Sequence, residues 1–288
     1  MHSIDWNALN RLRTAFLTGT TGGSDYWTSE SDLDSYDQTF AQRIGWKWDY
    51  VLRDIKLRNW ISPAGTILDW GCGTGIASRK FLEHFRDVSR LYLCDRSPLA
   101  MNFAARQVPG VDVWKESSPP QSVDVLLISH ALTEQPEPFT LPCEAKTVIV
   151  VEPGTYEVSR RLIALRERLR NQYNVVAPCT HQSACGMLAP GNERHWCHHF
   201  APSPPEVFMD GDWARFAKVA GIDLRSLPVS YLVLDKRTVT ATGTRDIGKA
   251  RVYKAHALVL TCDENGVRDR RVTKRESPEE FRRLKKGK

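Results

Sequence analysis

Apolar residues recur at two different spacings along this chain of 288 residues, and the spacing divides the chain into regions. Residues 3–17 and 37–58 carry apolar side chains three or four positions apart, which predicts two amphipathic helices. Ser3 is a candidate cap at the start of the first helix. Residues 18–36 are rich in Gly, Ser, Thr and Asp, and this composition predicts a loop between the helices.

Beyond about residue 60, short apolar runs alternate with helical segments. The run at 123–129 is almost wholly apolar, which is typical of a buried parallel strand. Strands that alternate with helices predict an α/β fold with a doubly wound, Rossmann-like parallel sheet. The expected strands are 66–68, 90–94, 111–113, 123–129 and 147–151, and the expected helices are 76–85, 97–106 and 156–173.

Residues 177–205 interrupt this alternation. They hold three Cys, four His and five Pro without a periodic run, so we expect an inserted module that is not held by a hydrophobic core. A helix at 211–220 and strands at 230–234 and 255–261 then resume the α/β pattern. The expected parts are an N-terminal helical region (1–60), a Rossmann-like core (61–176), the Cys-rich insertion (177–205), the remainder of the sheet (206–266) and a basic tail (267–288).

The net charge of +6 is concentrated at the C-terminus. Residues 267–288 hold ten Lys or Arg against four acids, which accounts for the whole excess. A basic tail on a neutral body predicts contact with an anionic polymer such as RNA. No apolar stretch approaches the roughly 20 residues that a membrane span needs. Acids interrupt the N-terminal segment, which has no apolar core typical of a secretory signal, so we expect no targeting peptide.

A glycine-rich loop follows the first expected strand and opens a helix. Gly71, Gly73 and Gly75 allow a tight turn and let the backbone approach a ligand closely. Asp69 precedes the loop. Asp95 ends the second expected strand, twenty residues beyond Gly75, where an acid accepts hydrogen bonds from ribose hydroxyls.

Two nucleoside cofactors, NAD and S-adenosylmethionine (SAM), fit this arrangement. In the dinucleotide motif the third glycine lies three positions after the second, whereas here it lies two positions after it. An acid two residues before the first glycine, as Asp69 is, resembles class I SAM-dependent methyltransferases, in which it lies near the methionine end of the cofactor. We therefore expect a SAM-binding methyltransferase sheet.

Residues 129–134 follow the fourth expected strand, where several methyltransferase classes carry their chemistry. The chain has neither Asn-Pro-Pro-Tyr nor Asp-Pro-Pro-Tyr there. His130 is a candidate general base, but we interpret it first as part of the wall of the cofactor pocket. Because methyl transfer can proceed by alignment alone, the sequence assigns no catalytic residue.

The seven cysteines are odd in number and include a cluster in the insertion. Cys179, Cys185 and Cys197 lie within it, and Cys262 ends a strand far downstream. Three thiols in one module with a fourth on a neighbouring element predict a four-thiolate metal site. Zinc and iron–sulfur clusters both accept four thiolates, and the spacing does not separate them.

The chain resembles the Rsm22 family, methyltransferase-like proteins of the mitochondrial and bacterial small ribosomal subunit. The matching segments cover most of the chain. They are Arg43-Ile44-Gly45-Trp46-Lys47-Trp48, Leu68 to Gly75, Val151-Glu152-Pro153-Gly154-Thr155, Ala177-Pro178-Cys179-Thr180-His181, Trp196-Cys197-His198-His199-Phe200, Ser230-Tyr231-Leu232-Val233-Leu234 and Cys262. Thr180 stands where the family has Pro, and Cys185-Gly186-Met187 replaces Cys-Pro-Leu.

The resemblance implies a 4Fe–4S cluster on Cys179, Cys185, Cys197 and Cys262, with SAM at the glycine loop. It also implies association with the small ribosomal subunit during assembly, and the basic tail agrees with an rRNA partner. The compartment would be the bacterial cytoplasm, or the mitochondrial matrix in a eukaryote.

Three functions follow, and the sequence leaves open whether the protein is an enzyme. We favour a SAM-dependent rRNA methyltransferase-like protein. The first alternative is a non-catalytic iron–sulfur assembly or checkpoint factor, which keeps the cofactor pocket. The second is a small-molecule methyltransferase with a structural zinc, against which the basic tail counts.

Overall fold

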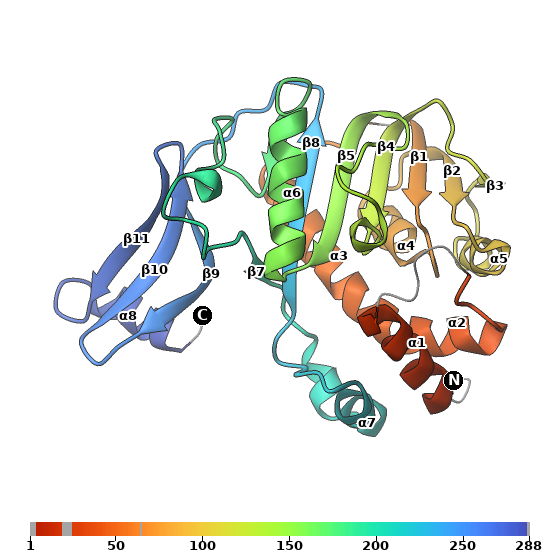
Figure 1. Ribbon diagram of the computed structural model, residues 1–288, viewed down its shortest axis with the longest axis horizontal. Coiled ribbons are helices and arrows are strands. Elements are labelled where there is room, and N and C mark those ends of the chain that lie inside the picture. Colours follow the sequence, from red (N-terminus) through yellow and green to blue (C-terminus); the bar gives the residue numbers. More distant parts are fainter. Residues whose placement is uncertain (1–3, 19–24, 64, 287–288) are drawn as a thin grey trace.

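The first five strands form the parallel part of one large sheet. In the computed structural model, which describes residues 4–18, 25–63 and 65–286, their order is β3-β2-β1-β4-β5 (Figure 1). They are β1 (Gly65–Trp70), β2 (Val88–Cys94), β3 (Val113–Glu116), β4 (Ser122–Ser129) and β5 (Glu144–Pro153). Each lies at or beside an apolar run that predicts a strand, which confirms the α/β class.

One reversed strand makes the sheet mixed rather than wholly parallel. β8 (Pro228–Asp235) runs antiparallel between β5 and β6 (Asn174–Ala177), and the short β7 (His199–Phe200) pairs with its start. From Val229 onward every residue of β8 is buried, as a central strand requires. This order departs from the parallel 3-2-1-4-5-6 order of dinucleotide-binding folds.

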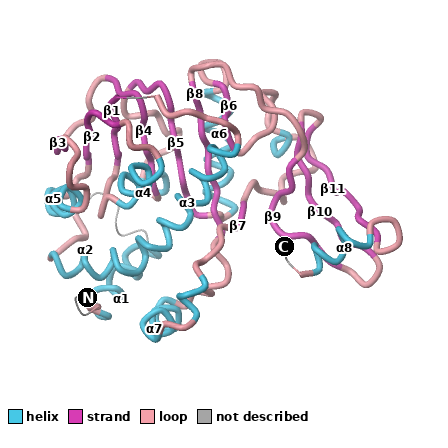
Figure 2. The backbone as a smooth tube through the Cα atoms, turned by 180° about the vertical axis from the view of Figure 1, so that it is seen from behind, coloured by secondary structure: helices cyan, strands magenta, loops and turns pink. Residues whose placement is uncertain are grey.

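Helices cover both faces of the large sheet. On one face lie α3 (Gln42–Leu57), α4 (Ile76–His84) and α5 (Pro98–Arg106), and on the other lies α6 (Tyr156–Leu169) (Figures 1 and 2). Alternate strand residues fill two apolar layers, as the twofold repeat of a strand dictates. No helix in the described ranges is long and apolar enough to cross a membrane.

The N-terminal region contains one more helix than the sequence predicts. Besides α1 (Trp6–Thr18), the expected loop at 18–36 contains α2 (Glu30–Tyr36), and a π-helical turn (Asp37–Ala41) joins it to α3. The Ser29 hydroxyl accepts a hydrogen bond from the Asp32 N–H at 3.2 Å, and Leu33 is fully buried. Seven residues are too few to show an apolar period. The candidate cap Ser3 lies outside the described residues.

The C-terminal part of the chain forms a second sheet, and this corrects two expectations. β9 (Arg245–Val252), β10 (His256–Asp263) and β11 (Gly266–Thr273) form an antiparallel sheet, and α8 (Pro278–Lys285) packs on it. Of the strands in 206–266, only β8 joins the large sheet. The described residues of the expected basic tail form β11 and α8 and are therefore folded. Val272 and Phe281 are buried against β10. In the chain between β7 and β8, α7 (Gly211–Ala220) forms at the expected residues and packs against α1.

Candidate cofactor site and cysteine cavity

The glycine loop turns sharply between β1 and α4. Gly71 and Gly75 adopt φ values of 69° and 76°, which favour glycine over other residues. A Cβ on Gly71 would lie 3.0 Å from the Cβ of Ala131, and a Cβ on Gly75 would lie 2.9 Å from the Cβ of Ala104. A Cβ on Gly73, by contrast, would meet no atom within 4 Å. The outer glycines therefore satisfy packing inside the protein, while the middle one leaves the backbone open to a ligand.

Asp69 is completely buried behind this loop. Its Oδ2 accepts hydrogen bonds from the backbone N–H of Ser78, at 3.1 Å, and from the Ser78 hydroxyl, while its buried Oδ1 has no partner among the described residues. Burial raises the pKa of Asp69 to about 7, although the bonds from Ser78 oppose this shift. The carboxyl group thus holds the first turn of α4 against the end of β1.

Asp95 ties the end of β2 to the same loop. Its Oδ2 accepts a hydrogen bond from the Gly73 N–H and its Oδ1 one from the Ser97 N–H, each at 2.9 Å. Burial raises the pKa of Asp95, and the two backbone bonds lower it in part. The structure therefore brings Asp95 and the glycine loop together, at the carboxyl ends of β1 and β2. Ligands of open α/β sheets bind at this edge.

His130 follows β4 and lies next to two charged residues that the sequence patterns did not single out. Its backbone has φ of 53°, which is unusual for a residue other than glycine. Its Nε2 lies 3.2 Å from the Nζ of Lys47 on α3. Glu152, at the end of β5, accepts hydrogen bonds through Oε1 from the N–H groups of Ala131 and Leu132, at 3.1 and 3.0 Å.

The side chains of Lys47 and Glu152 both have strongly shifted pKa values. Burial and the nearby Arg43 guanidinium lower the pKa of Lys47 to about 7, while burial raises the pKa of Glu152 to about 7. A signal for both was present in the sequence, since Lys47 interrupts the apolar stripe of its helix and Glu152 ends an apolar strand. Charged residues in such positions are candidates for a functional site.

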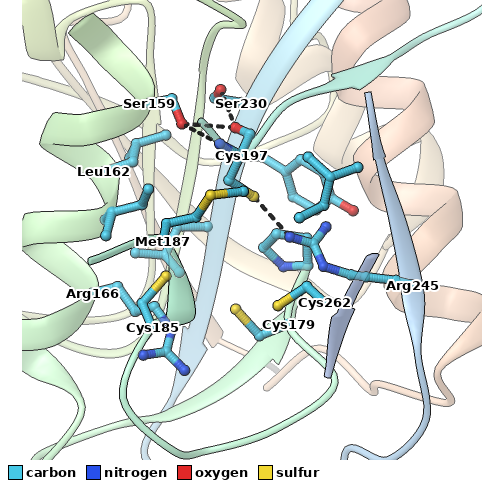
Figure 3. Close-up of a pocket in the computed structure, with 15 residues that line it drawn as sticks. Ser159, Leu162, Arg166, Cys179, Cys185, Met187, Cys197, Ser230, Arg245 and Cys262 are labelled. Carbon is cyan, nitrogen blue, oxygen red and sulfur yellow. Dashed lines mark hydrogen bonds between the residues drawn. The ribbon is translucent and has the colours of Figure 1, made fainter. Parts of the chain in front are cut away.

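The four cysteines of the expected metal site line one cavity (Figure 3). Cys179 follows β6, Cys185 and Cys197 lie farther along the insertion, and Cys262 comes from β10 of the second sheet. Apolar side chains, including Met187, complete the lining. Among the described residues, no three or more His, Cys, Asp or Glu side chains are grouped closely enough to hold a metal ion.

Two arginines face this cavity among the thiols (Figure 3). Arg245 on β9 donates hydrogen bonds to the Cys197 Sγ at 2.7 Å and to the His199 Nε2 at 2.6 Å. Arg166 on α6 donates to the Ser183 carbonyl at 2.8 Å and is nearly fully buried. The cavity therefore places cysteine sulfurs next to fixed positive charge.

Burial also disfavours free thiolates in this cavity. It raises the pKa of Cys185 to about 12 and that of Cys262 to about 11. Burial alone would lower the pKa of Arg245, but its electrostatic interactions with Cys197 and Cys179 and its hydrogen bond to Cys197 outweigh burial and raise that pKa. The other three cysteines, Cys72, Cys94 and Cys143, do not line the cavity.

Comparison with known proteins gives one family and several distant structural neighbours. The family model described as mitochondrial small ribosomal subunit Rsm22 matches residues 51–288. No curated protein matches the chain. Similar solved structures include M. capricolum TrmK with S-adenosylhomocysteine, at 11% identity over 66% of this chain and 69% of that one, with a TM-score of 0.36.

Two further neighbours carry the word methyltransferase in their names. A putative RNA methyltransferase from Pyrococcus horikoshii is 12% identical over 74% of this chain and 87% of its own, with a TM-score of 0.38. The plantazolicin methyltransferase BamL, in complex with a triazolic desmethylPZN analog and S-adenosylhomocysteine, is 11% identical over 80% of this chain and 97% of its own, with a TM-score of 0.42.

Proposed function

The chain belongs to the mitochondrial small ribosomal subunit Rsm22 family, and from this premise we propose that it is a SAM-dependent methyltransferase-like protein that acts on or beside small-subunit rRNA. One observation carries the cofactor part of the proposal. Asp95 holds the N–H of Gly73 at the one glycine of the loop that faces open space. An acid and an open backbone at adjacent strand ends suit the ribose and the amino-acid end of a nucleoside cofactor.

In this proposal SAM supplies an electrophilic methyl group, and the protein supplies the alignment. Asp95 accepts hydrogen bonds from the ribose hydroxyls. Gly73 provides the close backbone approach, while Gly71 and Gly75 let the loop pack tightly against Ala131 and Ala104. Asp69 keeps the loop in place through Ser78. His130 forms part of the wall on the side of β4.

We also propose that Cys179, Cys185, Cys197 and Cys262 bind a 4Fe–4S cluster. The donor set fits, because four sulfurs from two sheets face one cavity whose buried arginines offset the charge of thiolates. A cluster carries one thiolate on each of four separate irons, so its ligands stand farther apart than four ligands of a single ion. A structural zinc is the alternative occupant of the same thiols.

A non-catalytic role in ribosome assembly is the second candidate. It is favoured by the position of Cys262, which links the cavity to the second sheet and its basic residues. In that role the cluster braces an RNA-binding surface, and the cofactor pocket serves as a sensor or as a structural element.

Isothermal titration of the cluster-replete protein with SAM tests the first function. We expect the wild type to bind and Asp95→Ala to bind about 10- to 100-fold more weakly, since bonds to a charged group contribute about 1.5–3 kcal/mol. Asp112→Asn is the control, because Asp112 pairs with Arg90 on the surface. A wild type that binds no SAM would refute the methyltransferase proposal. Crosslinking in cells followed by RNA sequencing tests the partner.

A further inference from the structure

Helix α3 places two buried cations near the carboxyl ends of β4 and β5. Arg43 and Lys47 are one turn apart and therefore share a face of the helix. Their exposed fractions are 8% and 7%. Lysine and arginine are almost never buried to this degree unless they are paired.

Neither cation forms an ion pair with a carboxylate of the described residues. Arg43 donates one long hydrogen bond, 3.4 Å, to the Ser226 carbonyl, and its buried Nη1 has no partner in that part of the chain. Within the described residues, the one hydrogen-bonding contact of the Lys47 ammonium group is with the ring of His130. Asp223 is the carboxylate whose charge acts on Arg43. It is already paired with Arg225 on the surface.

Glu152 does not satisfy this pair of cations. Its Oε1 is occupied by two backbone N–H groups, and its buried Oε2 has no hydrogen-bond partner among the described residues. One carboxyl group also leaves an excess of positive charge against Arg43 and Lys47. Burying a cation without a partner costs several kcal/mol, so an anion bound between these two groups would stabilise this part of the fold.

The two cations lie beside the glycine loop. Ala131, next to the His130 that contacts Lys47, packs against Gly71, where a Cβ would lie 3.0 Å from its own. α3 also touches the first turn of α4, since a Cβ on Gly45 would lie 3.1 Å from Ile76 Cδ1. An anion held by the cations would therefore adjoin the cofactor site.

We propose that Arg43 and Lys47 form a binding subsite for an oxyanion beside the glycine loop. A planar guanidinium and an ammonium group together match a carboxylate or a phosphate. Two sources supply this chemistry, namely the carboxylate of the methionine part of SAM and a phosphate of bound RNA. The first source rests on the proposed function, and the second does not depend on cofactor binding.

The test compares Lys47→Gln and Arg43→Gln with Arg53→Gln, a control on an exposed position of the same helix. Isothermal titration uses SAM and 5′-methylthioadenosine, which keeps the nucleoside and the methylated sulfur, as a thioether, but lacks the aminocarboxypropyl group that carries the carboxylate. A loss of about 10- to 100-fold for SAM only, with methylthioadenosine unchanged, assigns the subsite to the cofactor carboxylate.

An unchanged SAM affinity, combined with weaker binding of a small-subunit rRNA transcript and a salt slope reduced by about one, assigns the subsite to an RNA phosphate. Inorganic phosphate gives a readout that is independent of SAM and RNA. It should raise the Tm of the wild type and of Arg53→Gln but not of Lys47→Gln. A wild type that does not bind SAM but whose Tm is raised by phosphate would contradict the proposed function and support the subsite.

Loss of folding is distinguished by a second variant. Lys47→Met removes the unpaired charge and keeps the volume, so it should raise the Tm of the ligand-free protein. If SAM, the rRNA transcript and inorganic phosphate all fail to separate Lys47→Gln from Arg53→Gln, or if Lys47→Met lowers the Tm, the oxyanion subsite is overturned.

Discussion

Arg245 donates a hydrogen bond to the Sγ of Cys197 at 2.7 Å, across 48 residues of sequence and between two sheets. The arginine comes from β9 of the second sheet, and the cysteine precedes β7 of the first. The same guanidinium bonds His199, whose Nδ1 lies 3.4 Å from the hydroxyl of Tyr50 on α3. The cysteine cavity is therefore a junction between the large sheet and the C-terminal sheet.

Replacing Arg245 should weaken this junction. Arg245→Gln removes a buried charged donor and leaves Cys197 and His199 without their partner, so we expect a loss of about 1–3 kcal/mol in the free energy of unfolding. Chemical denaturation followed by fluorescence measures it. Arg225→Gln on the surface should change that free energy by no more than about 0.5 kcal/mol. Equal stabilities of the two variants would contradict a structural role for the Arg245 bond.

Glu152 should make the fold less stable as the pH rises. Its pKa in the folded protein is raised from 4.5 to about 7, so the native state holds a proton that the unfolded state has lost across this range. Between those pH values this shift lowers the free energy of unfolding of the wild type by about 3 kcal/mol. In Glu152→Gln that loss should be absent. Denaturation at a series of pH values measures the slope, and the exposed Glu157→Gln should keep the wild-type profile. A slope unchanged in Glu152→Gln would show that Glu152 is not the group responsible.

Metal content should depend on the cysteines of the cavity and not on the others. In anaerobically purified protein, Cys262→Ser should lose iron and acid-labile sulfide, because it removes the ligand supplied by the second sheet. Cys143→Ser should retain both, since Cys143 lies outside the cavity. A colourless wild type with one bound zinc would exclude the cluster, and full iron content in Cys262→Ser would remove Cys262 from the ligand set.

Binding of rRNA should depend on the exposed basic residues of α8. The described part of the C-terminal segment is folded, so deleting 267–288 would also remove β11, and neutralising surface charge is the cleaner test. Arg282→Gln/Arg283→Gln/Lys285→Gln should weaken binding of a small-subunit rRNA transcript and lower its salt slope by about 0.9 for each phosphate that the variant no longer neutralises. An unchanged slope with an intact circular dichroism spectrum would place the RNA-binding surface elsewhere.

Much of the large sheet was determined by the sequence itself. The apolar runs of β1, β4 and β5 and the glycine loop after β1 are local patterns, and local patterns report secondary structure directly. Asp95 could be placed beside Gly73 for the same reason, because adjacent parallel strands end at the same edge. The cysteines of the cavity could be grouped only because their residue type is rare.

The tertiary structure decided what local patterns cannot carry. Periodicity predicts that β10 is a strand, but it does not show which strands pair with it. β10 pairs with β9 and β11 and not with the large sheet, because of the apolar faces that are buried against each other in the folded chain. Lys47 and His130 are 83 positions apart, and neither segment carries a pattern that predicts their contact. Side chains from distant segments come together only when the whole core has packed. Their charge interactions and pKa shifts are therefore determined by the tertiary structure and cannot be predicted from the local motifs.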